Sequence, residues 1–195
     1  MKGGDGMESA LIVSSVGKSI DFFREMLDAV SCPQIVTLAT GGEARRLLLT
    51  REFDLVIIYA PLPDETGENL SRYIADKGMS QTILVVKSQY YDAVSAATED
   101  YGILTIARPI NRNVFWAALK MAGAAQNRLK IMHEENNRLM QKIEDIRLID
   151  RAKCILISYL NMSEQGAHRY IEKQAMDRRI SKRAVAEGIL KTYEN

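Results

Sequence analysis

The sequence predicts an α/β domain with a five-stranded, doubly wound parallel sheet, followed by a long coiled-coil helix and a small all-α domain of three helices. Three observations lead to this prediction. Residues 8–122 alternate short apolar segments with helical patterns, a heptad repeat follows, and the last 45 residues place short helical patterns around a basic run. Regular strand–helix alternation is typical of a parallel sheet that is covered by helices.

The composition is that of an ordinary globular protein. The 195-residue chain is 47% apolar and 26% charged, which allows one or two domains. Its longest apolar segments have the length of strands and are too short to span a membrane. Residues 1–7 lack the apolar core of a signal peptide and are expected to form a disordered lead. Cys32 and Cys154 stand alone, without metal-ligand spacing. We therefore expect a cytoplasmic protein with no membrane association, no cofactor and no metal.

The alternating region is expected to form five βα units. The expected strands are residues 10–14, 34–38, 54–59, 82–86 and 103–107, and the helices between them are residues 19–29, 42–50, 68–77 and 92–100. Asn111 or Asn113 is expected to cap a further helix. The third strand is an unbroken, β-branched segment, which is typical of a strand buried on both faces.

Turn residues after two of these strands support a more specific comparison. Pro63 and Gly67 follow the third strand, and Arg108 and Pro109 follow the fifth. With this spacing, residues 8–122 resemble a response-regulator receiver domain, which has a flavodoxin-like fold. The resemblance implies an acidic pair that holds Mg²⁺, an aspartate that accepts a phosphoryl group, and a lysine before the second proline.

These chemical groups are replaced in this chain. The resemblance places the acidic pair at Ser14 and Ser15, the acceptor at Tyr59, a hydroxyl residue at Lys87 and the lysine at Arg108. Neutral hydroxyl groups do not offset the cost of dehydrating Mg²⁺, and a tyrosine does not form an acyl phosphate. We therefore predict a pseudoreceiver that is not phosphorylated at the usual site. Its two cations either attract an anion without covalent transfer or fill a vestigial pocket.

A heptad repeat covers residues 115–147. Its ten core positions hold nine apolar residues and one asparagine, namely Phe115, Ala118, Ala122, Ala125, Leu129, Met132, Asn136, Leu139, Ile143 and Ile146. Heptads sustained over this length predict a coiled coil, and an asparagine in the core favours a parallel two-stranded register. We predict a homodimer whose seam runs from Leu129 through Asn136 to Ile146. The alternative is a single long helix whose first third packs on its own α/β domain.

Positive charge is concentrated at the C-terminal end. Residues 151–195 contain nine Lys or Arg against five Asp or Glu, a net charge of +4, whereas the whole chain carries only +1. Four of these cations, Arg178, Arg179, Lys182 and Arg183, lie within six positions. A polyanion such as nucleic acid is the first candidate partner. A solvated helical face is the alternative.

Several spaced motifs make the nucleic-acid interpretation more specific. They are Arg151-Ala152-Lys153, Ser163-Glu164-Gln165-Gly166-Ala167-His168, Gln174-Ala175-Met176-Asp177-Arg178-Arg179, Ala184-Val185-Ala186 and Ile189-Leu190. In this order they resemble the ANTAR domain, the three-helix RNA-binding module of transcription antiterminators of the AmiR/NasR type. We assign residues 147–195 to this domain, with Gly166 as a departure from the family pattern.

The resemblance and the charge pattern together nominate RNA-binding residues. These are Ala152, Lys153, His168, Arg169, Tyr170, Arg178, Arg179, Lys182 and Arg183. The first helix is expected to continue the coil to about residue 160, Asn161 or Ser163 to cap the second helix, and Ser181 to cap the third. Tyr170 and His168 are candidates for stacking on unpaired bases, although Tyr170 is equally a candidate for the core.

The function implied by the resemblance is transcription antitermination. Such proteins bind hairpins in a leader transcript and keep a terminator from forming, and a ligand-sensing protein holds some of their pseudoreceivers. Two alternatives remain, a DNA-binding response regulator and a protein-only signalling adaptor. The third helix is apolar beyond Arg183, which disfavours major-groove recognition. Because no nucleophile–base pair, glycine-rich phosphate loop or carboxylate dyad is found, we do not expect an enzyme.

Overall fold

The computed structural model describes residues 7–78 and 80–193, and the chain divides into two compact units, Met1–Ile131 and Met132–Asn195. Residues 1–6 of the expected lead lie outside the described residues. Met7, which was also expected to belong to the lead, is instead buried, because its apolar side chain packs into the core of the first unit.

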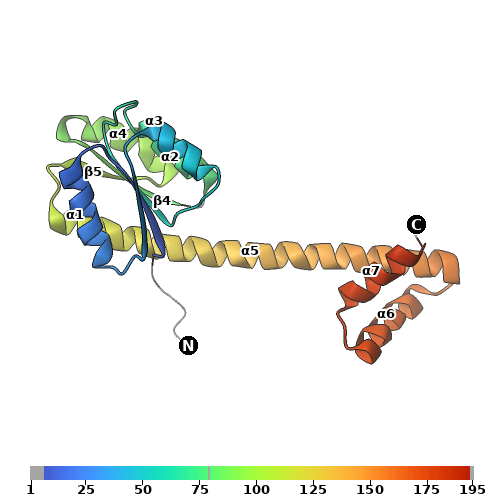
Figure 1. Ribbon diagram of the computed structural model, residues 1–195. Coiled ribbons are helices and arrows are strands. Elements are labelled where there is room, and N and C mark those ends of the chain that lie inside the picture. Colours follow the sequence, from blue (N-terminus) through green and yellow to red (C-terminus); the bar gives the residue numbers. More distant parts are fainter. Residues whose placement is uncertain (1–6, 79, 194–195) are drawn as a thin grey trace. The chain divides into compact units, whose positions relative to one another are not determined.

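The first unit is built on a parallel sheet of five strands among its described residues, in the order β2-β1-β3-β4-β5 (Figure 1). The strands are β1 Ser9–Val13, β2 Gln34–Leu38, β3 Leu55–Tyr59, β4 Gln81–Lys87 and β5 Leu104–Arg108. In register, Leu11 of β1 lies between Val36 of β2 and Val56 of β3. This strand order confirms the predicted flavodoxin-like, doubly wound fold.

Helices cover both faces of the sheet. They are α1 Gly17–Asp28, α2 Gly41–Leu48, α3 Glu68–Lys77, α4 Tyr91–Thr98 and the start of α5 Arg112–Leu160, with short 3₁₀ turns η1 Ser88–Tyr90 and η2 Glu99–Tyr101. Alternate strand residues point to opposite faces. Ile12 and Ile57 pack with α1 and α5, whereas Val56 and Ile58 pack on the side of α2, α3 and α4 (Figure 1).

The first part of α5 belongs to the core of the first unit. Asn111 begins this helix by accepting hydrogen bonds from the backbone N–H groups of Asn113 and Val114 at 2.9 and 3.3 Å, so Asn111 is the cap. Phe115 and Ala122 are buried against the sheet. Both are core positions of the predicted heptad repeat that lie before the predicted dimer seam. They face the protein's own sheet, as the alternative interpretation proposed for the first third of the helix.

The heptad positions that follow have a different environment. Met132, Leu139, Ile143 and Ile146 have well-exposed side chains, and Asn136 is also exposed. Leu129 is half-buried. A row of exposed large apolar residues at heptad spacing leaves apolar surface in water, which a partner helix would cover. The seam predicted for a dimer is thus open from Met132 onward.

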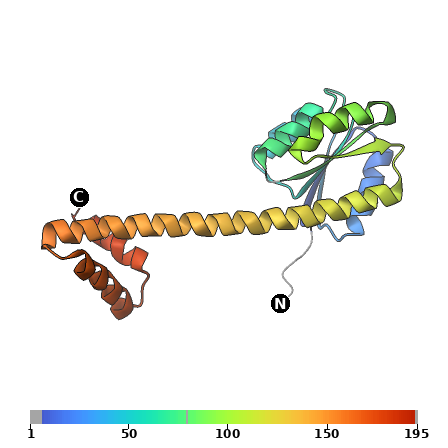
Figure 2. The same cartoon turned by 180° about the vertical axis from the view of Figure 1, so that it is seen from behind.

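The second unit is a three-helix domain formed by the C-terminal part of α5, α6 Glu164–Arg178 and α7 Lys182–Tyr193. Both views show α6 and α7 beside the end of α5 (Figures 1 and 2). Small and branched side chains form its core, including Ala152 and Leu156 of α5, Ile171 of α6 and Ala186 of α7. This arrangement confirms the predicted all-α C-terminal domain.

Local signals set the ends of these helices. Asn161 adopts a left-handed conformation (φ 50°) just after α5, and Ser163 then caps α6 by accepting the N–H of Gly166 at 3.1 Å. Ser181 accepts the N–H of Ala184 at 3.1 Å at the start of α7. Of the two predicted caps for the second helix, Ser163 is therefore the one used. None of the described helices is both long and apolar enough to cross a bilayer.

Candidate functional site

Two regions contain the predicted functional residues, and the first is the carboxyl edge of the sheet. Ser14 and Ser15 follow β1, whereas Tyr59, Lys87 and Arg108 end β3, β4 and β5. The Ser14 hydroxyl is buried and lies 2.7 Å from the Ser19 hydroxyl, and it also accepts the N–H of Val16. Ser14 therefore organises the loop into α1, while Ser15 is exposed.

Arg108, at the end of β5, contacts Tyr59 at the end of β3. Its guanidinium lies 4.8 Å above the centre of the Tyr59 ring, and its Nη1 donates a 3.1 Å hydrogen bond to the Tyr59 hydroxyl. Ser88 donates a 2.7 Å hydrogen bond to the carbonyl of Arg108. Lys87 is paired in register with Arg108, and its side chain is exposed. The structure thus brings Tyr59 and Arg108, the residues at the predicted acceptor and lysine positions, into contact, and places Lys87 beside Arg108 in register.

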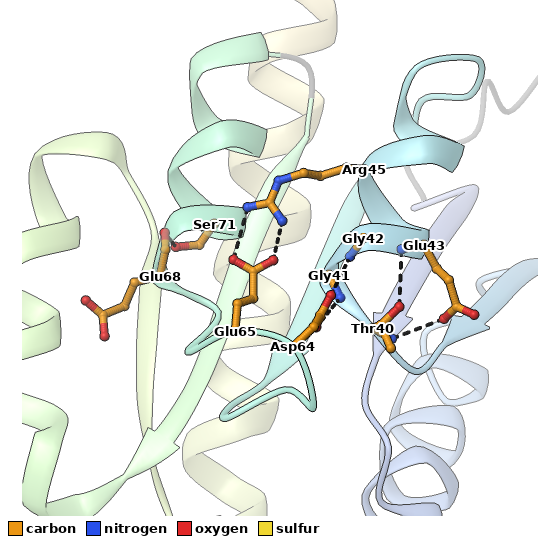
Figure 3. A network of polar contacts seen from close by, with 9 residues as sticks. All are labelled: Thr40, Gly41, Gly42, Glu43, Arg45, Asp64, Glu65, Glu68 and Ser71. Carbon is orange, nitrogen blue, oxygen red and sulfur yellow. Dashed lines mark hydrogen bonds and ion pairs between the residues drawn. The ribbon is translucent and has the colours of Figure 1, made fainter.

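Two acids of the loop after β3 point to α2 and are engaged there (Figure 3). The Asp64 carboxylate accepts the N–H groups of Gly41 and Gly42 at 2.9 and 2.8 Å, which lowers the pKa of Asp64. Glu65 pairs with both terminal nitrogens of Arg45. A Cβ on Gly41 would overlap the Glu65 carboxylate, so glycine permits this close approach. Both acids are therefore held at α2.

The start of α2, where Asp64 binds, is stabilised by a helix cap. The Thr40 hydroxyl accepts the N–H of Glu43, and the Glu43 carboxylate accepts the N–H of Thr40, both at 3.2 Å (Figure 3). This reciprocal capping box satisfies donors at the start of the helix. The described residues contain no group of three or more His, Cys, Asp or Glu side chains that could hold a metal ion.

A buried carboxylate that sequence reasoning missed lies at the opposite edge of the sheet. Asp54 accepts the N–H groups of Glu8 and Ser9 at 2.7 and 3.1 Å and pairs with Lys130 of α5 at 2.8 Å. Burial by itself would raise the pKa of Asp54, but the Lys130 contact and the two backbone donors outweigh it and lower the pKa. The sequence signal that could have identified this site is an acidic residue, Asp54, directly before the apolar strand β3.

The second region is the three-helix domain, where the predicted RNA-binding residues fall into three groups. The first group contains one buried residue. Ala152 is fully buried in the helix core, so the expectation that it contacts RNA directly is corrected: its small side chain allows close packing of the helices.

The second group consists of cations that are bound to carboxylates. Lys153 lies 2.8 Å from Asp150 and 3.1 Å from Glu164, and its side chain is only 16% exposed. These two acids raise the pKa of Lys153. An RNA phosphate would have to compete with them, so this lysine is less available than its sequence position suggests.

Lys182 and Arg183 are also paired with acids. Lys182 lies 2.5 Å from Glu172, which His168 also contacts at 3.2 Å. Arg183 contacts Asp145 of α5 at 2.7 Å and Glu187 of its own helix at 2.8 Å. The Lys182 contact lowers the pKa of Glu172, and the Arg183 contact lowers that of Asp145. The basic run therefore carries less free positive charge than a count of its residues indicates.

The third group contains exposed cations without an acidic partner among the described residues. Arg169, Arg178 and Arg179 belong to it. Lys173, which sequence reasoning did not select, has the same environment and lies one turn after Arg169 on the same face of α6. Arg179 ends the helix in a left-handed conformation (φ 53°).

Apolar side chains lie among these cations. Met176 is 78% exposed and follows Lys173 on the outer face of α6, and Tyr170 is 38% exposed. Tyr170 was proposed either for stacking or for the core, and its ring is accessible on part of its surface. The outer face of α6 and its C-terminal end, consisting of Arg169, Tyr170, Lys173, Met176, Arg178 and Arg179, are called the α6 surface below.

Comparison with known proteins agrees with this architecture. The family profile of the ANTAR domain matches residues 137–190, a span that includes the last turns of the predicted coil. The C-terminal part of the chain is therefore an ANTAR domain, and its N-terminal part has the CheY-like receiver fold.

The chain is similar to the transcriptional regulatory protein PdtaR of Mycobacterium tuberculosis, with 27% identity over 152 residues that cover 78% of this chain and 74% of the relative. Among solved structures, the receiver domain of an HD domain-containing protein from Pseudomonas fluorescens gives a TM-score of 0.57 at 22% identity and covers 71% of this chain and 98% of that chain. A CheY-like receiver protein from Methanospirillum hungatei gives 0.54 at 20% identity, covering 63% and 98%. These structures establish the fold alone.

Proposed function

We propose that this protein is an RNA-binding transcription antitermination regulator that binds hairpins in a leader transcript. The observation that carries the proposal is the ANTAR domain together with its α6 surface. The exposed arginines of that surface can bind phosphates, and Tyr170 and the guanidinium planes can stack on unpaired loop bases. Binding to a nascent transcript would take place in the cytoplasm.

The test compares binding of the full chain to a leader hairpin, to a blunt RNA duplex and to a DNA duplex of equal length at physiological salt. The proposal expects the hairpin to bind most tightly, because an accessible loop offers unstacked bases. Equal affinity for duplex DNA would favour a DNA-binding regulator. If none of the three binds, the protein-only adaptor becomes the better account.

We also propose that the receiver-like domain is a pseudoreceiver. Ser14 and Ser15 supply hydroxyl groups where receivers have acids, Tyr59 stands at the acceptor position, and Asp64 is engaged at α2. Incubation with acetyl phosphate, or with beryllofluoride and Mg²⁺, is expected to leave the mass and the RNA affinity unchanged. A stable phosphoryl adduct within residues 54–65 would contradict this proposal. A ligand-sensing regulatory protein is then the candidate source of the input signal.

Homodimerisation is the third part of the proposed function. The exposed seam consists of Met132, Asn136, Leu139, Ile143 and Ile146, with Leu129 half-buried at its start. A parallel pair of α5 helices would cover these apolar side chains and place two Asn136 amides side by side. Two ANTAR domains in one dimer suit a leader with paired hairpins, because linked binding sites gain from effective concentration.

A further inference from the structure

The carboxyl edge of the sheet carries two cations, Lys87 and Arg108, that the described residues do not neutralise. Lys87 and Arg108 stand at the same register on neighbouring strands, so their side chains start from the same side of the sheet. Neither forms an ion pair with any of the described residues. Because both side chains are cationic and start from neighbouring positions, an anion between them would reduce their mutual repulsion.

Arg108 is also incompletely satisfied as a hydrogen-bond donor. One terminal nitrogen donates to the Tyr59 hydroxyl, whereas Nε is buried and has no hydrogen-bond partner among the described residues. A guanidinium presents five donors in a planar fork that matches the oxygens of phosphate. A buried donor without a partner is costly. The contact with Tyr59 therefore satisfies Arg108 less well than an oxyanion would.

The surroundings supply a further donor and space. The Tyr59 hydroxyl can donate a hydrogen bond to an oxygen of the bound anion. The acids of the loop after β3, Asp64 and Glu65, are bound at α2. Lys87 lines a hollow of about 420 Å³ whose other walls include Pro61, Val86, Val94 and Tyr90, so this residue joins the hollow to the contact between Arg108 and Tyr59, which do not line it. Glu68 also lines this hollow, without pairing with Lys87.

We propose that this edge is a binding site for a small phosphate-type oxyanion, held reversibly by Arg108 and Lys87 with the Tyr59 hydroxyl as a further donor. Arg108 would exchange its contact with the Tyr59 ring for a bidentate contact with the anion. The apolar walls of the hollow beside Lys87 can take the organic part of a phosphate monoester. No covalent step is involved, so the inference rests on the proposed absence of phosphorylation but not on RNA binding.

The chain contains a built-in reporter for testing this site. Trp116 is its single tryptophan and packs against the core of the first unit. Thermal unfolding of the full chain followed by Trp116 fluorescence therefore reports on this unit, even if phosphate also binds elsewhere. The midpoint temperature of this unfolding is measured with increasing inorganic phosphate at constant ionic strength, and chloride is the reference anion. The apparent affinity for phosphate is calculated from the increase in the midpoint temperature with phosphate concentration.

The proposal expects phosphate, and not chloride, to raise the midpoint. Arg108→Gln should weaken phosphate binding about tenfold or more, because a charge-assisted bidentate contact is lost. Lys87→Gln should weaken it less, and Tyr59→Phe should leave it within a few-fold. Lys142→Gln, which removes one exposed cation from the second unit, is the matched control and should change nothing. If Arg108→Gln does not fold, Lys87→Gln still decides the question against the Lys142→Gln control.

A second arm with phenyl phosphate identifies the source of the anion. Tighter binding than inorganic phosphate would indicate a monoester that uses the hollow, whereas equal or weaker binding would indicate the free ion. The proposal is overturned if chloride produces the same rise, or if Arg108→Gln and Lys87→Gln behave like the control. RNA affinity of the same variants is measured in parallel, so a failed anion site is distinguishable from a failed RNA site.

Discussion

The two units use their shares of α5 in opposite ways. In the first unit, Phe115 and Ala122 are buried against the sheet, and Lys130 is tied to the buried Asp54. In the second unit, the heptad side chains of Leu139 and Ile143 are exposed. One uninterrupted sequence repeat therefore has two structural meanings, because a heptad pattern records which positions are apolar and not which surface will cover them.

The units also differ in whether their basic side chains are paired with carboxylates. In the receiver-like unit, Lys87 and Arg108 have no carboxylate partner within the part of the chain that the structure describes. In the ANTAR domain, Lys182 and Arg183 are bound to acids, while the arginines of the α6 surface are open. A charge count from sequence therefore overestimates the free positive charge at Lys182 and Arg183. The same count does not single out Lys87 and Arg108.

The largest expected effect concerns the buried part of α5. Phe115→Ala should destabilise the first unit by about 3–5 kcal/mol, because it removes a fully buried ring and leaves a cavity. Met121→Ala, an exposed position on the same helix, is the matched control and should change stability by less than about 0.5 kcal/mol. Denaturant unfolding followed by Trp116 fluorescence measures both. Similar losses for the two variants would remove the distinction between the buried and exposed faces.

The exposed part of α5 is tested through self-association. Leu139→Glu places a charge in the proposed seam and should shift a dimer to monomer in sedimentation equilibrium, while the first unit unfolds as in the wild type. Glu144→Gln lies on the same helix at an exposed position and serves as the control. A wild-type monomer at micromolar concentrations would contradict the dimer, and an antiparallel pair would contradict the argument from Asn136.

A smaller effect is expected from the ion pair that ties α5 to the sheet. Asp54→Ala should cost about 2 kcal/mol, because two backbone donors and Lys130 lose a buried acceptor. Glu25→Gln breaks the fully exposed pair with Arg112 and should have little effect. Since the pKa of folded Asp54 is lowered, its contribution is present above the unfolded pKa of about 3.9 and is lost as pH falls through the folded value.

This pH dependence offers a second check on the same contact. Wild-type stability should fall more steeply on acidification than that of Asp54→Ala, because only the wild type loses this ionised acceptor. Parallel stability curves for the two proteins between neutral and acidic pH would show that Asp54 does not carry the proposed contribution.

Local signals explain how much of the fold could be predicted. Residues 68–77 were predicted as a helix with the bounds that α3 has. In the structure, Gly67 and Gly78 flank this helix in left-handed conformations. The predicted strand 34–38 coincides with β2. Ser181 was identified as a cap because serine readily accepts a backbone N–H at a helix start. These features depend on residues close together in the sequence.

Contacts between distant residues could not be predicted in the same way. Asp54 and Lys130 meet only after the sheet has formed, and Arg183 meets Asp145 across 38 positions. Ala152 was expected at the RNA because of its place in a motif, and only the packing of three helices shows it to be buried. Lys173 was overlooked since it lies outside the basic run, although helical geometry brings it beside Arg169.

The central claim is that the open cations of the α6 surface, rather than the paired ones, bind the RNA. Two double variants with equal charge loss test it most directly, Arg178→Ala with Arg179→Ala and Lys182→Ala with Arg183→Ala. Affinity for a leader hairpin is measured over a range of salt concentrations. The first variant should lose affinity and reduce the log–log salt slope by about 0.7 per lost phosphate contact, whereas the second should change the slope less. A larger change in the second variant, or no change in either, would contradict the claim.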